Sequence, residues 1–185
     1  DTGKPVHNAI VWQDRRTADQ CRALRDAGHE PMIQERTGLV IDPYFSASKM
    51  RWLIDHETAV AQAGDALALG TVESWLVWNL TGGLHISDAS NASRTQLLAL
   101  DGANWDSALC DLFGVPVAAL PDIVDNEGDS GAASPGLLGG AIRICGLAGD
   151  QQSATIGQGC LSPGPAKATL GTGAFILAPT GTVLP

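Results

Sequence analysis

The stretch 142–158, IRICGLAGDQQSATIGQ, decides the fold that we expect for this chain. Apolar side chains alternate over 142–147, which predicts a strand, and small residues dominate 153–157, which predicts a closely packed helix. Between the two lie Gly149 and Asp150. A strand that leads into an acidic residue at the start of a helix is typical of α/β proteins, where such a residue lies at the carboxyl edge of the sheet. The stretch therefore predicts an α/β fold with Asp150 at that edge.

The position of Asp150 allows two interpretations. A partly desolvated carboxylate close to backbone N–H groups can accept the proton of a substrate hydroxyl, as the general base does in phosphoryl transfer. Alternatively, Asp150 only caps the helix, a role in which aspartate is common. The spacing by itself favours the cap, so the interpretation depends on the neighbouring stretches.

A second glycine-rich stretch follows at 166–178, AKATLGTGAFILA. Two apolar runs flank Gly171, Thr172 and Gly173, and this pattern predicts a β-hairpin. Glycines at the tip of a hairpin let backbone N–H groups approach an anion, and the threonine hydroxyl adds a further donor. Taken alone, such a hairpin is more often a simple turn.

In this order, a GDQQ helix followed by a GTG hairpin resembles the sugar and polyol kinases of the FGGY family. Within that family, the stretches 11–18 (VWQDRRTA), 37–49 (TGLVIDPYFSASK) and 90–95 (SNASRT) resemble the glycerol kinases. The resemblance extends over essentially all 185 residues. It implies an α/β fold of the ribonuclease H-like (actin-like ATPase) class, a mixed sheet with flanking helices, over 1–160. The segment 161–185 would open a second such domain with the phosphate-binding hairpin.

The resemblance implies an activity and a role for several residues. The activity is ATP-dependent phosphorylation of glycerol, or a similar small polyol, to glycerol 3-phosphate. Asp150 would be the catalytic base toward the terminal hydroxyl, and Gln151 would help to hold the polyol. Trp12, Tyr44 and Phe175 would shape the substrate pocket, because an aromatic ring offers an apolar face and tyrosine adds a polar group. Core packing is the alternative for Trp12.

The nucleotide would be ATP, with Mg²⁺ carried by its phosphates, because this ion keeps several waters and needs few protein ligands. Gly171, Thr172 and Gly173 would contact the phosphates. Two other functions stay open: a sister sugar kinase acting on a pentulose or gluconate, and a non-catalytic, polyol-binding fragment. The family's N-terminal phosphate hairpin and its adenosine-binding half have no counterpart in this sequence, so we expect the chain alone to be inactive.

Composition and charge exclude several other classes. Hydrophobic residues make up 44% of the chain and charged residues 17%, which predicts a folded core rather than disorder. The net charge is −9 and no basic stripe occurs, which argues against binding to nucleic acid or an anionic membrane. No apolar run approaches the ~20 residues of a membrane span. We therefore expect a cytoplasmic protein and leave open whether it is a homo-oligomer.

Cysteine and histidine positions give no metal site. The four cysteines form no CxxC pair, and the four histidines are scattered. Cys21 and Cys145 lie in apolar patterns and are expected as buried free thiols. No protein-bound metal is therefore expected.

Hydrophobic periodicity and glycine positions predict the other elements. Strands are expected over 6–13 and 66–69. The expected helices cover 17–27, 46–63, 72–80 and 105–113. Four tryptophans within these helices are expected in the core, namely Trp52, Trp75, Trp78 and Trp105.

Overall fold

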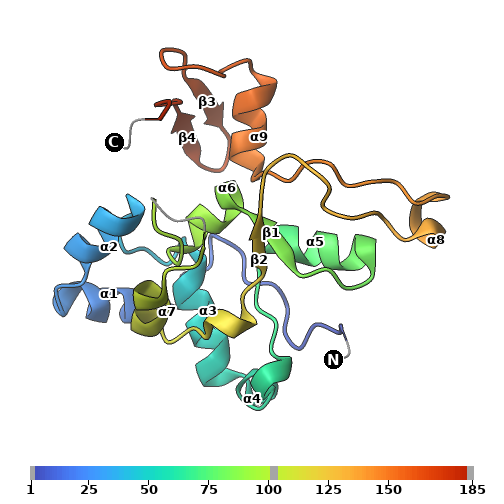
Figure 1. The fold of residues 1–185 in the computed structure, drawn as a ribbon. Helices are drawn as coiled ribbons and strands as arrows, with labels where there is room; N and C mark the ends of the chain where they lie inside the picture. The colour runs from blue at the N-terminus through green and yellow to red at the C-terminus, as the bar shows by residue number, and fades with distance from the viewer. Residues whose placement is uncertain (1–2, 101–103, 183–185) are drawn as a thin grey trace. The chain divides into compact units, whose positions relative to one another are not determined.

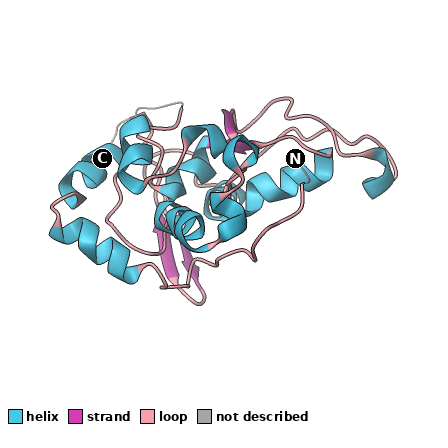
Figure 2. Cartoon of the chain, turned by 90° about the horizontal axis from the view of Figure 1, so that it is seen from below, coloured by secondary structure: helices cyan, strands magenta, loops and turns pink. Residues whose placement is uncertain are grey.

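The computed structural model describes residues 3–100 and 104–182. The chain divides into two compact units, 1–147 and 148–185, and each is described here by itself (Figure 1). Helices and loops predominate, and the strands are short (Figure 2). The domain boundary after residue 160 that the family resemblance implies stays a prediction.

The first unit contains most of the helices. Where the sequence predicts strands alternating with helices, this unit consists mainly of short helices that pack around a shared core. Those described in this unit are α1 (Ala18–Asp26), α2 (Glu30–Thr37), α3 (Ser46–His56), α4 (Thr58–Ala61), α5 (Val72–Thr81), α6 (Ala89–Ala92), α7 (Ser107–Phe113) and α8 (Pro135–Leu138), with single 3₁₀ turns at Gly64–Ala66, Ser93–Thr95 and Val117–Ala119.

Helix ends follow the local chemistry of the sequence. Helices α2, α5 and α7 each end at a glycine in the left-handed conformation, for example Gly38 with φ of 70°. At the other end of α7, the Asp106 carboxylate accepts a hydrogen bond of 3.0 Å from the Leu109 N–H. The helices predicted over 17–27, 72–80 and 105–113 are confirmed within one or two residues. The one predicted over 46–63 is interrupted at Glu57, whose backbone is extended.

The sheet of the first unit is small. Strands β1 (Ile86–Asp88) and β2 (Asp122–Val124) pair in parallel, with Ile86 opposite Asp122. Helix α5 precedes β1 and packs against it (Figure 1). A parallel pair needs a crossover, and here the chain between the strands supplies α6 and α7.

The strand predicted over 142–147 is wrong as a regular strand. This segment forms an irregular antiparallel ladder with 126–133, through isolated bridges at Arg143 and Gly146. The ladder runs out from β2 and back, with α8 at its far end (Figure 1). Gly128 and Gly131 have φ of 144° and 92° in the partner segment, a conformation that interrupts regular pairing. Asp150 therefore does not follow a sheet strand.

The core of the first unit joins α1, α2, α3 and α7. Its largest fully buried apolar side chain is Phe113, 2% exposed. Around it gather Cys21, Ile33, Ile41, Ala47, Met50, Leu69, Leu97, Leu109, Cys110, Val115, Ala119 and Leu120. Of the four tryptophans expected in the core, Trp105 packs against this cluster, whereas Trp75 is 43% exposed.

Three further sequence predictions fail in the first unit. The segment 6–13 is a loop and not a strand, and 66–69 begins at the last residue of the 3₁₀ turn Gly64–Ala66 and continues as a loop that starts with extended Leu67. Cys145 is exposed, because the ladder that carries it has no buried face at that position, whereas Cys21 is buried as expected. Both failed strands are apolar runs too short for periodicity to distinguish a strand from loop or turn. Of the helices described, none has the length and apolar character that a membrane span needs.

The second unit is a helix and a hairpin, as the sequence predicts. Helix α9 (Asp150–Gly157) is followed by strands β3 (Lys167–Leu170) and β4 (Ala174–Leu177). The strands are antiparallel, with Leu170 opposite Ala174, so that the turn consists of residues 171–173. The helix packs against β4.

Candidate functional site

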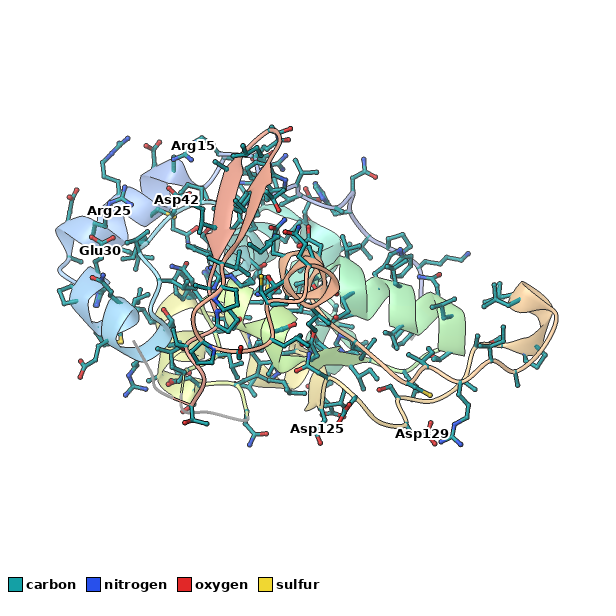
Figure 3. All side chains as sticks on the ribbon, turned by 90° about the horizontal axis from the view of Figure 1, so that it is seen from above. Arg15, Arg25, Glu30, Asp42, Asp125 and Asp129 are labelled. Atoms are coloured by element: carbon teal, nitrogen blue, oxygen red, sulfur yellow. The ribbon has the colours of Figure 1, made fainter. Side chains whose placement is uncertain are left out.

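The loop 39–45 carries Tyr44, and its backbone is held from several sides. The peptide groups of Ile41 are held at both ends: its carbonyl accepts from Arg25 of α1, and its N–H donates to Glu30 of α2 at 3.0 Å. These charged side chains gather on the α1–α2 side of the loop (Figure 3). Gln96 donates to the Val40 carbonyl at 2.7 Å. A loop tied in this way presents its aromatic side chain from a fixed backbone.

The turn at Asp42 and Pro43 fixes Tyr44 itself. The Asp42 carboxylate accepts from the Tyr44 N–H at 2.8 Å, which closes an Asx turn. Lys49 of α3 is buried and its ammonium donates to the Pro43 carbonyl. Burial lowers the pKa of Lys49 below its ordinary value. The sequence analysis did not single out this lysine, although a lysine on the inward face of a helix was a usable signal.

Trp12 and Tyr44 come together, although 32 positions separate them in the sequence. Their rings meet edge to face, with centroids 5.6 Å apart and planes at 62°. Trp12 is 44% exposed, so core packing is wrong for this residue. The pair therefore presents a half-exposed aromatic surface on the first unit.

The segment that carries Trp12 is anchored on α3. Arg16 binds the Asp14 carboxylate through two nitrogens, at 2.8 and 3.0 Å. Hydrogen bonds from Arg16 lower the pKa of Asp14 to about 2. The same guanidinium lies over the Trp52 ring, 4.5 Å from its centroid. Helix α3 thus supports both the Trp12 segment and the Tyr44 loop.

Asp150 is the first residue of α9 and not its cap. Gly149 occupies the N-cap position and has no side chain with which to cap the helix. One Asp150 carboxylate oxygen accepts from the Gln151 N–H at 2.8 Å. The expectation of a partly desolvated carboxylate is wrong, because the side chain projects from the helix end and is exposed. Its exposure leaves the carboxylate oxygens accessible to a small molecule.

The side chain of Gln151 lies between Asp150 and Lys167 and is hydrogen-bonded to both. The Gln151 Nε2 donates to the second Asp150 oxygen over a long distance of 3.5 Å. The Gln151 Oε1 accepts from the ammonium of Lys167 on β3, which is 1% exposed. The sequence analysis missed Lys167 as well. Its signal was a lone charged residue in an otherwise apolar strand.

The turn of the hairpin is compact and open to solvent. The Gly171 N–H donates to the Gly173 carbonyl at 2.9 Å, and Thr172 at the tip is exposed. A Cβ on Gly171 would meet nothing within 4 Å, so a ligand can approach the backbone there. A Cβ on Gly173 would lie 2.7 Å from the ring of Phe175, which packs over the turn. A larger residue at 173 would therefore force this ring to move.

The structure thus gathers the predicted residues into two groups. Trp12 and Tyr44 form a pair on the first unit. In the second unit, the helix start carries Asp150 and Gln151, and the hairpin carries Phe175 and the turn 171–173. Each group offers a different chemistry: aromatic surface in the first, and a carboxylate, an amide and an open turn in the second.

Solved structures share this fold. The crystal structure of Plasmodium falciparum glycerol kinase with ADP matches this chain with a TM-score of 0.88 and 38% identity. The match covers 95% of this chain and 36% of the kinase. Gluconate kinase from Lactobacillus acidophilus matches over 92% and 35%, with a TM-score of 0.82 and 23% identity, which shows the fold alone. The chain therefore has the α/β, actin-like ATPase fold of the sugar kinases, and the fold class predicted from the sequence is confirmed.

The family is equally clear. The family model for the N-terminal domain of the FGGY family of carbohydrate kinases matches residues 1–157. The chain belongs to this family, which confirms the resemblance found in the sequence motifs.

Curated relatives include bacterial glycerol kinases. The glycerol kinase of Paracidovorax citrulli is 56% identical over an alignment of 185 positions that covers 98% of this chain and 36% of the relative. That of Rhodospirillum rubrum is 55% identical over an alignment of 180 positions that covers 95% of this chain and 36% of the relative. The chain spans a little over a third of the length of these relatives.

Proposed function

We propose that this chain is part of an ATP-dependent glycerol kinase, which transfers a phosphoryl group from ATP to a terminal hydroxyl of glycerol and forms glycerol 3-phosphate. The similarity to the glycerol kinases described above supports glycerol rather than a sugar as the substrate. Because the chain spans about a third of those relatives, the proposal concerns the full-length protein. A cytoplasmic location belongs to the same proposal and rests on the family resemblance.

The observation that carries the proposal is the state of Asp150. A capping aspartate would stand one position earlier, where Gly149 lies, and the Asp150 carboxylate bonds only to the N–H of the next residue, Gln151, among the first-turn N–H groups described. The Asp150 carboxylate is exposed at the end of the helix. In phosphoryl transfer the attacking hydroxyl must lose its proton, and a carboxylate within hydrogen-bond reach can take it. Asp150 is therefore assigned as the catalytic base.

The aromatic pair suits a small polyol. An edge-to-face arrangement leaves part of the Trp12 ring exposed, and the apolar face of such a ring packs against C–H groups. The Tyr44 phenol adds a polar group for a hydroxyl. We assign Trp12 and Tyr44 to substrate binding, and Gln151 and Phe175 to the same role in the second unit.

The turn 171–173 fits a phosphate. The Thr172 hydroxyl is exposed, and the backbone at Gly171 is open to approach. ATP, when bound, supplies the phosphoryl group, and Mg²⁺ on its phosphates neutralises charge that develops in the transfer. The protein's part is to hold the phosphates at the turn through Gly171, Thr172 and Gly173.

The full-length variant Asp150→Asn tests the proposal. Asparagine keeps the shape and a carbonyl acceptor but cannot take up the proton. Turnover of glycerol, followed as ADP release, should fall by roughly 10²–10⁴-fold, while glycerol and ATP still bind. The matched control Asp26→Asn removes an exposed carboxylate at the end of α1 and should leave turnover unchanged. An Asp150→Asn variant within a few-fold of the wild type would end the assignment.

A further inference from the structure

Lys167 is buried in an unusual setting. It is 1% exposed on β3, and its ammonium donates to the side-chain oxygen of Gln151. Lysine is seldom fully buried, because removal of an ammonium from water is costly unless polar partners replace the water. The partner here is a neutral amide on α9, not a carboxylate. Because the buried ammonium donates to a neutral amide, we infer that its role is to hold that amide in one orientation.

The ammonium determines which way the amide of Gln151 faces. A lysine ammonium has three donors and no acceptor, so only the amide oxygen can face it. The NH₂ group must then lie on the opposite side, where Nε2 donates to an Asp150 carboxylate oxygen at 3.5 Å. With the amide reversed, two acceptors, Oε1 of Gln151 and the Asp150 carboxylate, would face each other.

We propose that Lys167 is a positioning residue for phosphoryl transfer: it acts through Gln151, whose amide it holds with the NH₂ group toward Asp150 and the substrate hydroxyl. The inference rests on the proposed function of Asp150 as the base.

The arrangement matches what a hydroxyl needs. A hydroxyl carries one hydrogen and two lone pairs. Asp150 can accept only the hydrogen, and the Gln151 NH₂, with one hydrogen toward Asp150, has a second to donate to the hydroxyl oxygen. Lys167 also ties the helix with Asp150 to the hairpin with the turn 171–173, since β3 leads directly into that turn.

A double-mutant cycle in the full-length protein tests this. Lys167→Met removes the ammonium and keeps the length of the side chain. With wild-type Gln151 it should lower kcat/KM for the polyol about tenfold, with KM for ATP changed less than about twofold. In the Gln151→Ala background the same substitution should change kcat/KM less than about twofold. Equal losses in both backgrounds would overturn the inference, because a purely structural role does not depend on Gln151.

A second variant separates the contact from folding. Gln151→Glu keeps an acceptor for Lys167, now as an ion pair, but has no NH₂ group. The ion pair with Lys167 and the repulsion from the Asp150 carboxylate act on stability in opposite directions, so its melting temperature should stay close to that of the wild type, while kcat/KM falls at least as far as in Gln151→Ala. Retained turnover in Gln151→Glu would show that the NH₂ group has no role.

A further measurement keeps this inference separate from the choice of substrate. The wild type is first assayed with glycerol, xylulose and gluconate, and the double-mutant cycle is then run with each compound that it phosphorylates. If none is phosphorylated, the proposed function fails. The side-chain amide signal of ¹⁵N-labelled Gln151, assigned by its loss in Gln151→Ala, then decides this inference. It should shift and broaden in Lys167→Met, and an unchanged signal would overturn the positioning role.

Discussion

Glu73 at the start of α5 should make the chain less stable as the pH rises through neutrality. One carboxylate oxygen accepts from the Ser87 hydroxyl at 2.7 Å and from the Asp88 N–H at 3.1 Å. The other is buried and has no hydrogen-bond partner within the described ranges. Burial, together with the nearby Asp88 carboxylate, raises the pKa of Glu73 from 4.5 to about 7. The folded protein therefore favours the protonated acid.

The sign and size of the effect follow from linkage. Between the unfolded pKa of 4.5 and the folded pKa of about 7, the folded state binds a proton that the unfolded state has released. Stability therefore falls as the pH rises through this window and levels off above it. The full difference corresponds to about 3 kcal/mol, and the partial exposure and coupling to Asp88 reduce the expected loss to about 2 kcal/mol.

The variant Glu73→Gln removes the titration and keeps the shape. Its amide oxygen still accepts from the Ser87 hydroxyl and the Asp88 N–H. Urea unfolding of both proteins at pH 5 and pH 8 measures the effect. The wild type should lose about 2 kcal/mol more than Glu73→Gln between these pH values.

A matched control is Glu35→Gln on α2, where the glutamate is exposed. It changes the net charge by the same amount, so it should follow the wild type's pH dependence. All other titratable groups are the same in the three proteins, so their contributions cancel in the comparison. If wild type and Glu73→Gln lost equal stability between pH 5 and pH 8, the account of Glu73 as a buried acid would be refuted.

Three other predictions concern single positions. Tyr44→Ala in the full-length protein should raise KM for glycerol about tenfold and leave KM for ATP almost unchanged; a change in the ATP constant instead would contradict the polyol assignment. Phe113→Ala should cost about 3–5 kcal/mol in urea unfolding, because it empties the centre of the core, and a loss below 1 kcal/mol would mean that this core is misidentified. Exposed Cys145 should react first with a thiol reagent, whereas Cys110, whose pKa burial raises to about 11, and buried Cys21 should react only on unfolding; rapid labelling of several thiols would contradict their burial.

Local patterns gave the second unit almost completely. A glycine followed by Asp150 predicted the start of α9, and the apolar runs around 171–173 predicted the hairpin. Both are local decisions, made by backbone preferences and turn residues a few positions apart. The strand over 142–147 failed because alternation only creates a face for burial. Whether that face is buried depends on the partner segment, and here glycines in 126–133 break the pairing.

The sequence by itself determined the class of protein, because the motifs that mark the family are short stretches whose order and spacing can be recognised without knowing how they pack. It determined the candidate residues for the same reason. Only the tertiary structure decided how they are supported. It brought Trp12 to Tyr44, placed Lys49 behind the Tyr44 loop, and set Lys167 behind Gln151. The contacts of Trp12 with Tyr44 and of Lys167 with Gln151 join positions 32 and 16 residues apart, and no local rule specifies them. Burial decides which lysine loses water, and the lysine then takes whichever acceptor the fold offers.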